Sequence, residues 1–166
     1  GGRCRLPAFG MAGLLMLCSD NLEHALAYAT RYQDLCYPLP RWTYERRGNT
    51  VVIMMDPAEL PPWLHPYALD HQLAAIAATA TELCGEPLRA SRIELVQPRP
   101  AHAERYRELY GVTPRFGAPA DRIMFDAAQW EKPLPRTDPG VIAQLELDCN
   151  AVLERRRARI GATGLV

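Results

Sequence analysis

Prolines divide this chain of 166 residues into short segments and so limit what it can build. The sequence holds 15 of them, and a proline can neither continue a helix nor donate a hydrogen bond within a sheet. Four lie between Pro57 and Pro66, and Pro87, Pro98 and Pro100 interrupt the chain further on. The chain therefore predicts short strands and separate helices, and it shows no internal repeat.

The segment from Arg41 to Met55 predicts a β-hairpin. Aromatic and polar residues alternate over Arg41–Arg46, and Arg47-Gly48-Asn49 supplies a turn. The following run, Thr50–Met55, is apolar and rich in β-branched residues. Because this run is apolar throughout, we expect the second strand to be more buried than the first.

Two helices are predicted around this hairpin. The first starts with Asp20 as N-cap and Glu23 as its capping-box partner, and it ends near Tyr37. The second runs from about Tyr67 to Cys84, with Gly85 at the C-cap. Each has a mostly apolar stripe at helical spacing: Leu22, Ala25, Leu26, Ala29 and Gln33 in the first, and Leu69, Leu73, Ile76, Ala80 and Leu83 in the second.

The remaining sequence predicts a strand, a short helix, two short strands and a long last helix. These are Ser91–Val96, Ala101–Tyr110, Val112–Phe116, Arg122–Phe125, and a helix from Asp138 to about Arg159. Since every strand is short and hairpins are common, we expect an α+β domain. Its sheet should be short, mixed, mostly antiparallel and covered by helices, with a long C-terminal helix.

Charge, length of apolar runs and cysteine usage exclude several classes of function. Nineteen basic residues balance nineteen acidic ones, so we expect this chain alone not to bind DNA. The longest apolar run, Met11–Cys18, has eight residues, against the roughly 18 that a membrane span needs. Five cysteines lie far apart, as reduced thiols of a cytoplasmic protein do.

The sequence predicts no catalytic residue, no metal site and no cofactor. Its histidines at positions 24, 65, 71 and 102 lack the spacing of metal ligands, and we find no nucleophile elbow or glycine-rich phosphate loop. A small enzyme that uses a Cys–His pair stays open as an alternative, because residues distant in sequence can meet in space.

Aromatic residues of the hairpin and of the second helix predict a small-molecule pocket. Trp42 and Tyr44 point the same way from their strand, and Met54 of the neighbouring strand joins them if the register allows. Tyr67 and His71 lie one turn apart on the next helix, and consecutive elements are usually neighbours in space. We therefore expect these five residues to line whatever cavity exists.

An ordered series of short motifs gives the chain a family resemblance over residues 9–147. The first segment is Phe9-Gly10-Met11-Ala12-Gly13, followed by Leu22, Ala25-Leu26 and Arg31-Tyr32. The second comprises Pro98-Arg99-Pro100, Tyr106, Leu109, Tyr110-Gly111, Pro114-Arg115-Phe116-Gly117-Ala118, Phe125-Asp126, Pro133-Leu134 and Asp138-Pro139. Together they resemble the arabinose-binding-type regulatory domain of AraC/XylS-family bacterial transcription regulators.

The resemblance implies a sensor for a small-molecule effector that also forms a homodimer. It places the sensor in residues 1–147 and a dimerisation or linker helix in residues 138–161. It further implies that helices precede Phe9-Gly10 in the native protein and that DNA is bound by a helix-turn-helix domain absent from this chain. A dimerisation module without an effector is the alternative.

The last helix carries the prediction of the dimer. Val141, Leu145, Cys149 and Val152 form an apolar stripe along it. A helix of this length, about 33 Å, exceeds what a domain of this size covers easily. We therefore expect the stripe to pack against the same helix of a second copy, unless the helix folds back over its own sheet and ends early, with Arg155 onward frayed.

Overall fold

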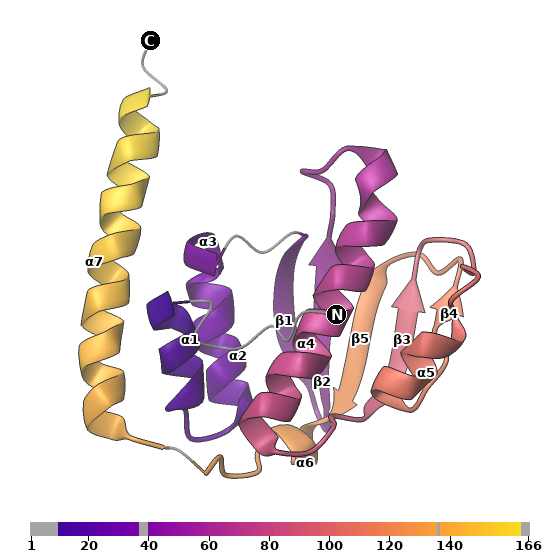
Figure 1. The fold of residues 1–166 in the computed structure, drawn as a ribbon, viewed down its shortest axis with the longest axis horizontal. Helices are drawn as coiled ribbons and strands as arrows, with labels where there is room; N and C mark the ends of the chain where they lie inside the picture. The colour runs from indigo at the N-terminus through magenta and orange to yellow at the C-terminus, as the bar shows by residue number, and fades with distance from the viewer. Residues whose placement is uncertain (1–9, 37–39, 136, 164–166) are drawn as a thin grey trace.

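The computed structural model describes residues 10–36, 40–135 and 137–163, with side chains up to residue 159. Within that part of the chain it contains seven α-helices, a 3₁₀ turn and five strands (Figure 1). Their bounds are α1 Gly10–Leu17, α2 Leu22–Arg31, α3 Gln33–Cys36, β1 Arg41–Arg47, β2 Thr50–Asp56, η2 Pro62–Leu64, α4 His65–Cys84, β3 Ala90–Leu95, α5 Glu104–Tyr110, β4 Arg115–Phe116, β5 Asp121–Asp126, α6 Ala127–Trp130 and α7 Pro139–Thr163.

The strands form one mixed sheet in the order β1-β2-β5-β3-β4. All neighbouring pairs are antiparallel except β3 and β4. Figure 1 shows α4 and α5 crossing the sheet, and apolar residues of α2, α4 and α5 join the core cluster of the strands. The α+β architecture expected from the sequence is confirmed.

Alternation along the strands sends one set of side chains into the core. In β5, Ile123 and Phe125 are fully buried, whereas Arg122 and Met124, which alternate with them along the strand, are partly exposed. The Phe125 ring lies 5.2 Å from the ring of Trp130 and 6.3 Å from that of Tyr110, measured between centroids. This aromatic group fixes α5 and α6 against the centre of the sheet.

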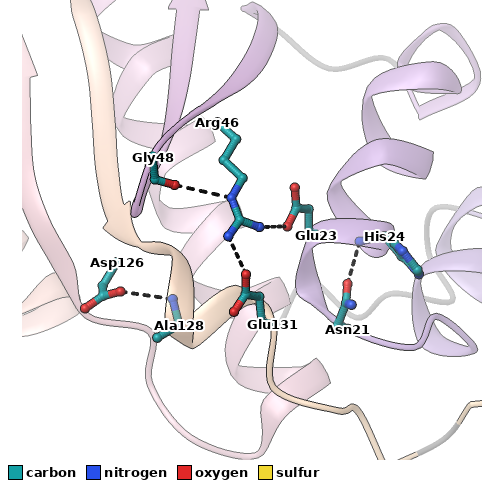
Figure 2. Close-up of polar contacts among 8 residues, drawn as sticks. All are labelled: Asn21, Glu23, His24, Arg46, Gly48, Asp126, Ala128 and Glu131. Carbon is teal, nitrogen blue, oxygen red and sulfur yellow. Dashed lines mark hydrogen bonds and ion pairs between the residues drawn. The ribbon is translucent and has the colours of Figure 1, made fainter.

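The predicted hairpin is confirmed, with the second strand the more buried of the two. Arg46, at the far end of β1, ties the hairpin to the helices (Figure 2). Its guanidinium donates to Glu23 of α2 at 2.9 Å and to Glu131, which follows α6. One side chain therefore joins three elements that are distant in the sequence.

The start of α2 differs from the prediction. Asn21, not Asp20, is the N-cap, and its side chain accepts the backbone N–H of His24 at 2.8 Å (Figure 2). Either side chain is suited to capping, and the extended backbone of Asn21 decides between them. The expected capping box around Asp20 is therefore wrong.

The predicted first helix is also interrupted. It ends at Arg31, and α3 follows after Tyr32, a fully buried residue whose hydroxyl donates to Asn150 at 2.9 Å. Two residues named in the predictions lie outside the described residues: Tyr37, near which this helix was expected to end, and Phe9 of the first motif. An additional helix, α1, precedes it, and its nearly continuous apolar sequence gave no helical periodicity to read.

Positive backbone angles confirm two predicted helix ends. Gly85 follows α4 with φ of 76°, and Gly111 follows α5 with φ of 81°. Glycine takes this left-handed conformation without the steric cost that other residues meet. His65 is the first residue of α4, two residues before Tyr67, where the sequence placed the start of this helix.

Strand β4 is shorter than the predicted strand Val112–Phe116, and it lies at the edge of the sheet. It pairs with β3 in parallel, through Glu94–Arg115 and Leu95–Phe116, so β3 separates it from β5. A parallel pairing of two residues leaves no hairpin signal in the sequence.

Asp126 at the end of β5 caps α6 by accepting the N–H of Ala128 at 2.9 Å (Figure 2).

The long last helix is confirmed as α7, and it begins as predicted. The carboxylate of Asp138 accepts the N–H of Val141 at 3.1 Å, and Pro139 is its first residue. Figure 1 shows α7 standing beside α1, α2 and α3, away from the sheet. Cys149 is fully buried and Leu145 half-buried there, in a cluster with Ala12 and Leu15 of α1.

This packing changes the prediction of a dimer through the apolar stripe of α7. Leu145 and Cys149 contact helices of their own chain, so they do not offer the free surface that the prediction required. The helix packs against its own domain, but it covers helices and not the sheet and continues to Thr163, so the alternative of a helix that ends early over the sheet is also wrong. Val141 is 42% exposed, and Val152 lines a groove shared with Met11 and Leu35.

A buried carboxylate lies on the sheet face opposite the core. Glu94 of β3 is 1% exposed and pairs with Arg122 of β5 and with Arg92 of its own strand. The hydrogen bond from Arg122 holds the pKa of Glu94 below its ordinary value of 4.5. Its cover consists of arginine side chains, not of a second layer of helices.

We expect replacement of Glu94 by Gln to lower the free energy of unfolding by about 1 kcal/mol near neutral pH. The cost is modest because both arginines are partly exposed. Since the folded-state pKa is depressed, this stabilisation is full above pH 4.5 and disappears as pH falls through the folded-state value. Urea unfolding of both proteins across this range measures it, and a difference that stays constant with pH would contradict the assignment.

Candidate functional site

A cavity of about 160 Å³ lies between α2 and α4, next to the β1 end of the sheet. Its walls come from six elements, namely α1, α2, α3, β1, α4 and α6. The lining residues are Met16, Leu22, Ala25, Leu26, Ala29, Gln33, Cys36, Trp42, His71, Gln72, Ala75, Ile76, Thr79, Ala80, Leu83 and Trp130. The cavity opens to solvent on one side, and exposed His71 lies at this rim.

Two helical stripes form the opposing walls. The stripe of α2 predicted from the sequence, Leu22 to Gln33, contributes all five of its residues. Helix α4 contributes residues in two rows spaced by four, one of them His71, Ala75 and Thr79. Four alanines stand among the residues of these walls, and their small side chains leave the space that larger residues would fill.

The lining is almost entirely uncharged. Among the described residues it contains no Asp, Glu, Lys or Arg, and its polar groups are the side chains of Gln33, Gln72, Thr79 and His71. Gln33 is already engaged, since its amide N–H donates to the carbonyl of Thr30 at 3.2 Å. Burial, and then the neighbouring Cys149, raise the pKa of the Cys36 thiol to about 11, so this thiol is neutral.

Trp130 gives the cavity a wall with an unsatisfied donor. The residue is 3% exposed, and its indole Nε1–H is buried without an acceptor in the described part of the chain. A buried donor without a partner costs about 1–3 kcal/mol. This nitrogen exposes almost no surface, so it is closed to a molecule in the cavity as the side chains stand.

Two of the five residues predicted to line the pocket do so. Trp42 of β1 and His71 of α4 are both lining residues. Tyr44 lies on the same face of β1 as Trp42 but packs, half-buried, against the core instead. Tyr67 is 66% exposed, and its ring stacks on that of His71 with centroids 6.2 Å apart.

Met54 lies on the wrong face of the sheet for the predicted pocket. It pairs with Thr43, whereas Trp42 pairs with Met55 and Tyr44 with Ile53. Directly paired residues share a face, and successive residues alternate, so Met54 points away from the Trp42 side. The register that the prediction left open therefore excludes Met54 from the cavity.

Most of the cavity wall was visible in the sequence but was assigned to the core. The stripe of α2 and the residues Ile76, Ala80 and Leu83 of α4 were predicted as packing surfaces. Their alanine content was the available signal of incomplete packing. Trp130 and Met16 gave no such signal, because they come from short elements that the sequence did not define.

The four cysteines that the structure describes lack the lowered pKa of a catalytic thiol. Burial raises the pKa of the Cys18, Cys84 and Cys149 thiols, as it does for Cys36, whereas reactive cysteines have lowered values. His102 instead pairs with Asp70 at 2.8 Å, in a contact that joins the start of α5 to α4. Tyr106 donates to the same carboxylate.

No group of three or more His, Cys, Asp or Glu side chains among the described residues is placed to hold a metal ion. None of the helices that the structure describes has the length and apolarity required to cross a membrane.

Comparison with known proteins places this architecture among bacterial regulators. The chain is 29% identical to the ornithine utilization regulator of Pseudomonas aeruginosa, over 92% of this chain and 45% of that protein. It is 28% identical to an uncharacterized HTH-type transcriptional regulator of Mycobacterium tuberculosis, over 100% of this chain and 49% of that protein. The chain thus spans about half the length of the curated relatives it matches.

A solved structure shares the fold. The crystal structure of the transcriptional regulator CdpR from Pseudomonas aeruginosa aligns with a TM-score of 0.63, over 83% of this chain and 45% of that one, at 18% identity. The sequence profile of the arabinose-binding domain of AraC transcription regulators, N-terminal, matches residues 1–134. The chain therefore belongs to the family of N-terminal arabinose-binding domains of AraC transcription regulators.

Proposed function

We propose that this domain senses a small molecule in the cavity between α2 and α4 and controls DNA binding by an attached helix-turn-helix domain. The observation that carries the proposal is the cavity itself, an apolar space with a few polar groups, which is the usual character of a ligand pocket. In this proposal residues 1–147 form the sensor, and residues 138–161 connect it to the rest of the regulator.

The attached domain is supported by the relatives. They are named as transcription regulators and are about twice as long as the matched region. A regulator of this kind acts where the DNA lies, so we place the protein in the bacterial cytoplasm. The name of one relative refers to ornithine utilization, but the uncharged lining of this cavity is unsuited to a molecule with several charges.

Filling the cavity tests the proposed function. We expect Ala75→Phe to abolish the response to any small molecule that stabilises the unmodified domain in a thermal-shift screen of metabolites. A ligand at 100 times its Kd adds about 2.7 kcal/mol, or roughly 5–10 °C in a domain of this size. Ala75 is half-buried and lines the cavity, so a phenyl group there occupies the ligand's space.

The matched control is Ala78→Phe on the exposed side of the same helix. This variant has the same change in helix propensity and should keep the full ligand response. A screen in which the hits act equally on Ala75→Phe and Ala78→Phe would refute a sensor built on this cavity. A complete absence of hits would favour the effector-free alternative.

A homodimer is the second part of the proposal. Leu14 of α1 and Val141 and Leu147 of α7 are exposed apolar residues on two helices that pack against each other. We therefore place the contact between copies on the outer side of α7, around Leu147, rather than on the buried residues Leu145 and Cys149. Such a contact would hold two attached DNA-binding domains at a fixed spacing.

A further inference from the structure

Helix α2 has the cavity on one side and the last helix on the other, since Figure 1 shows α1 and α2 between α7 and α4. We infer that α2 relays occupancy of the cavity to α7, so that a molecule held between α2 and α4 strengthens the docking of α7 on its own domain. The inference rests on the proposed function, because α7 contains most of the segment proposed to connect the sensor to the DNA-binding domain.

The buried apolar side chains form two separate clusters, and α2 contributes to both. The first cluster holds the strands, α4 and the inner side of α2, including Leu22 and Leu26. The second holds Tyr32, which is the C-cap of α2, together with Cys149 and Leu153 of α7. No residue of α7 in the described part of the chain belongs to the first cluster. Packing therefore holds α7 to the helices around α2 and not to the sheet.

Hydrogen bonds join the C-terminal end of α2 to the middle of α7. Asn150 Oδ1 accepts the hydroxyl of Tyr32 at 2.9 Å and a guanidinium N–H of Arg31 at 3.3 Å. Arg31 also pairs with Glu146 at 3.4 Å, but this pair is exposed to solvent and contributes little. Tyr32 is fully buried, so its bond to Asn150 is the stronger polar link between α2 and α7.

The other side of α2 leaves room for an occupant to stabilise this helix. Leu26 and Ala29 border the cavity that separates α2 from α4, so they lack the contacts across the gap that a filled core would give them. Arg46 fixes the start of α2 through Glu23, away from this gap. An occupant adds apolar contacts along the middle of α2. Because α7 docks on this helix, whatever holds α2 in place also favours the docked position of α7.

A cavity-filling substitution imitates an occupant and tests the relay without an identified ligand. Ala75→Phe places a phenyl group in the space beside the α2 wall, and amide hydrogen exchange reports the stability of each helix separately. We expect exchange in both α2 and α7 to slow by at least about fivefold, as added buried contacts should produce. Ala78→Phe, on the exposed side of α4, should leave exchange in both helices unchanged.

Tyr32→Phe separates the relay from a general gain in stability. It removes the hydrogen bond to Asn150 but keeps the ring in the second cluster. In this background Ala75→Phe should still slow exchange in α2, whereas its effect on α7 should fall to about twofold or less. The matched control is Tyr28→Phe, one turn earlier on α2. Tyr28 packs against the same cluster, and its hydroxyl makes no hydrogen bond to α7 among the described residues, so the full effect on α7 should remain.

Equal exchange of α7 in Ala75→Phe and Ala78→Phe would overturn the relay, and so would a full slowing of α7 in the Tyr32→Phe background. If Ala75→Phe fails to fold, Ala75→Leu fills less of the cavity and should give the same pattern. The metabolite screen decides the proposed function separately. A compound that binds the cavity and leaves exchange in α7 unchanged would refute the relay and leave the sensor intact.

Discussion

Phe125→Ala is expected to lower the free energy of unfolding by about 3–5 kcal/mol. Phe125 is fully buried at the centre of the sheet, and its ring contacts those of Tyr110 and Trp130. Truncation therefore opens a hole between the sheet, α5 and α6, which the surrounding rings cannot close without leaving their positions. Urea unfolding followed by far-ultraviolet circular dichroism measures the change.

The neighbouring residue on β5 provides the control. Met124 is half-buried on the opposite face of the sheet, so Met124→Ala should cost only about 1 kcal/mol. Equal losses for the two variants would mean that both faces of the sheet are covered to the same extent. That result would contradict a core formed on the helical face alone.

Cys149→Asp should have a comparable effect, confined to α7. Cys149 is fully buried against Ala12, Leu15 and Tyr32, where a carboxylate would lie among apolar and aromatic side chains. We expect a loss of about 3 kcal/mol or more in the docking of α7. Hydrogen exchange should show it as fast exchange over Pro139–Thr163 while α4 and the sheet stay protected.

Leu147→Asp is the matched control on the opposite side of α7. Leu147 is 65% exposed, so the substitution should change stability by less than about 0.5 kcal/mol. Under the proposed homodimer it should also lower the molecular mass measured by light scattering from that of two chains to that of one. Fast exchange of α7 in both variants would show that the helix is not docked through Cys149.

Local patterns in the sequence predicted the elements whose signals are also local. The hairpin follows from alternation around Gly48, and α4 follows from its stripe and from Gly85. Each of these features is decided by residues within one or two turns of one another. For the same reason the fold class could be predicted before any contact between distant segments was known.

Contacts between distant segments decided what the sequence left open or missed. Asn21 rather than Asp20 caps α2, and the buried Tyr32 ends this helix while bonding Asn150 of α7. The face of the sheet on which Met54 lies depends on the register between β1 and β2, because a shift of one residue would move it to the other face. The residues within each of these segments do not predict these outcomes, because each outcome depends on the rest of the fold.

The candidate site was predictable only in part, and for a physical reason. Trp42 and His71 were predicted because aromatic and polar residues on neighbouring elements suggest a pocket. The other wall, α2, reads as an ordinary apolar stripe, because a stripe that packs and a stripe that borders a cavity have the same periodicity. Only the distance between α2 and α4 separates the two cases, and that distance depends on the whole fold.

Methyl NMR of the domain during titration with a compound that stabilises it in the metabolite screen tests the central claim most directly. Binding between α2 and α4 predicts saturable shifts at the methyl groups of Leu26, Ile76 and Leu83, which line the cavity. Leu95, buried in the core outside the cavity lining, and exposed Leu147 should not respond. Shifts centred on Leu95 or Leu147, or no saturable shift at the cavity methyl groups, would contradict a small-molecule site in this cavity.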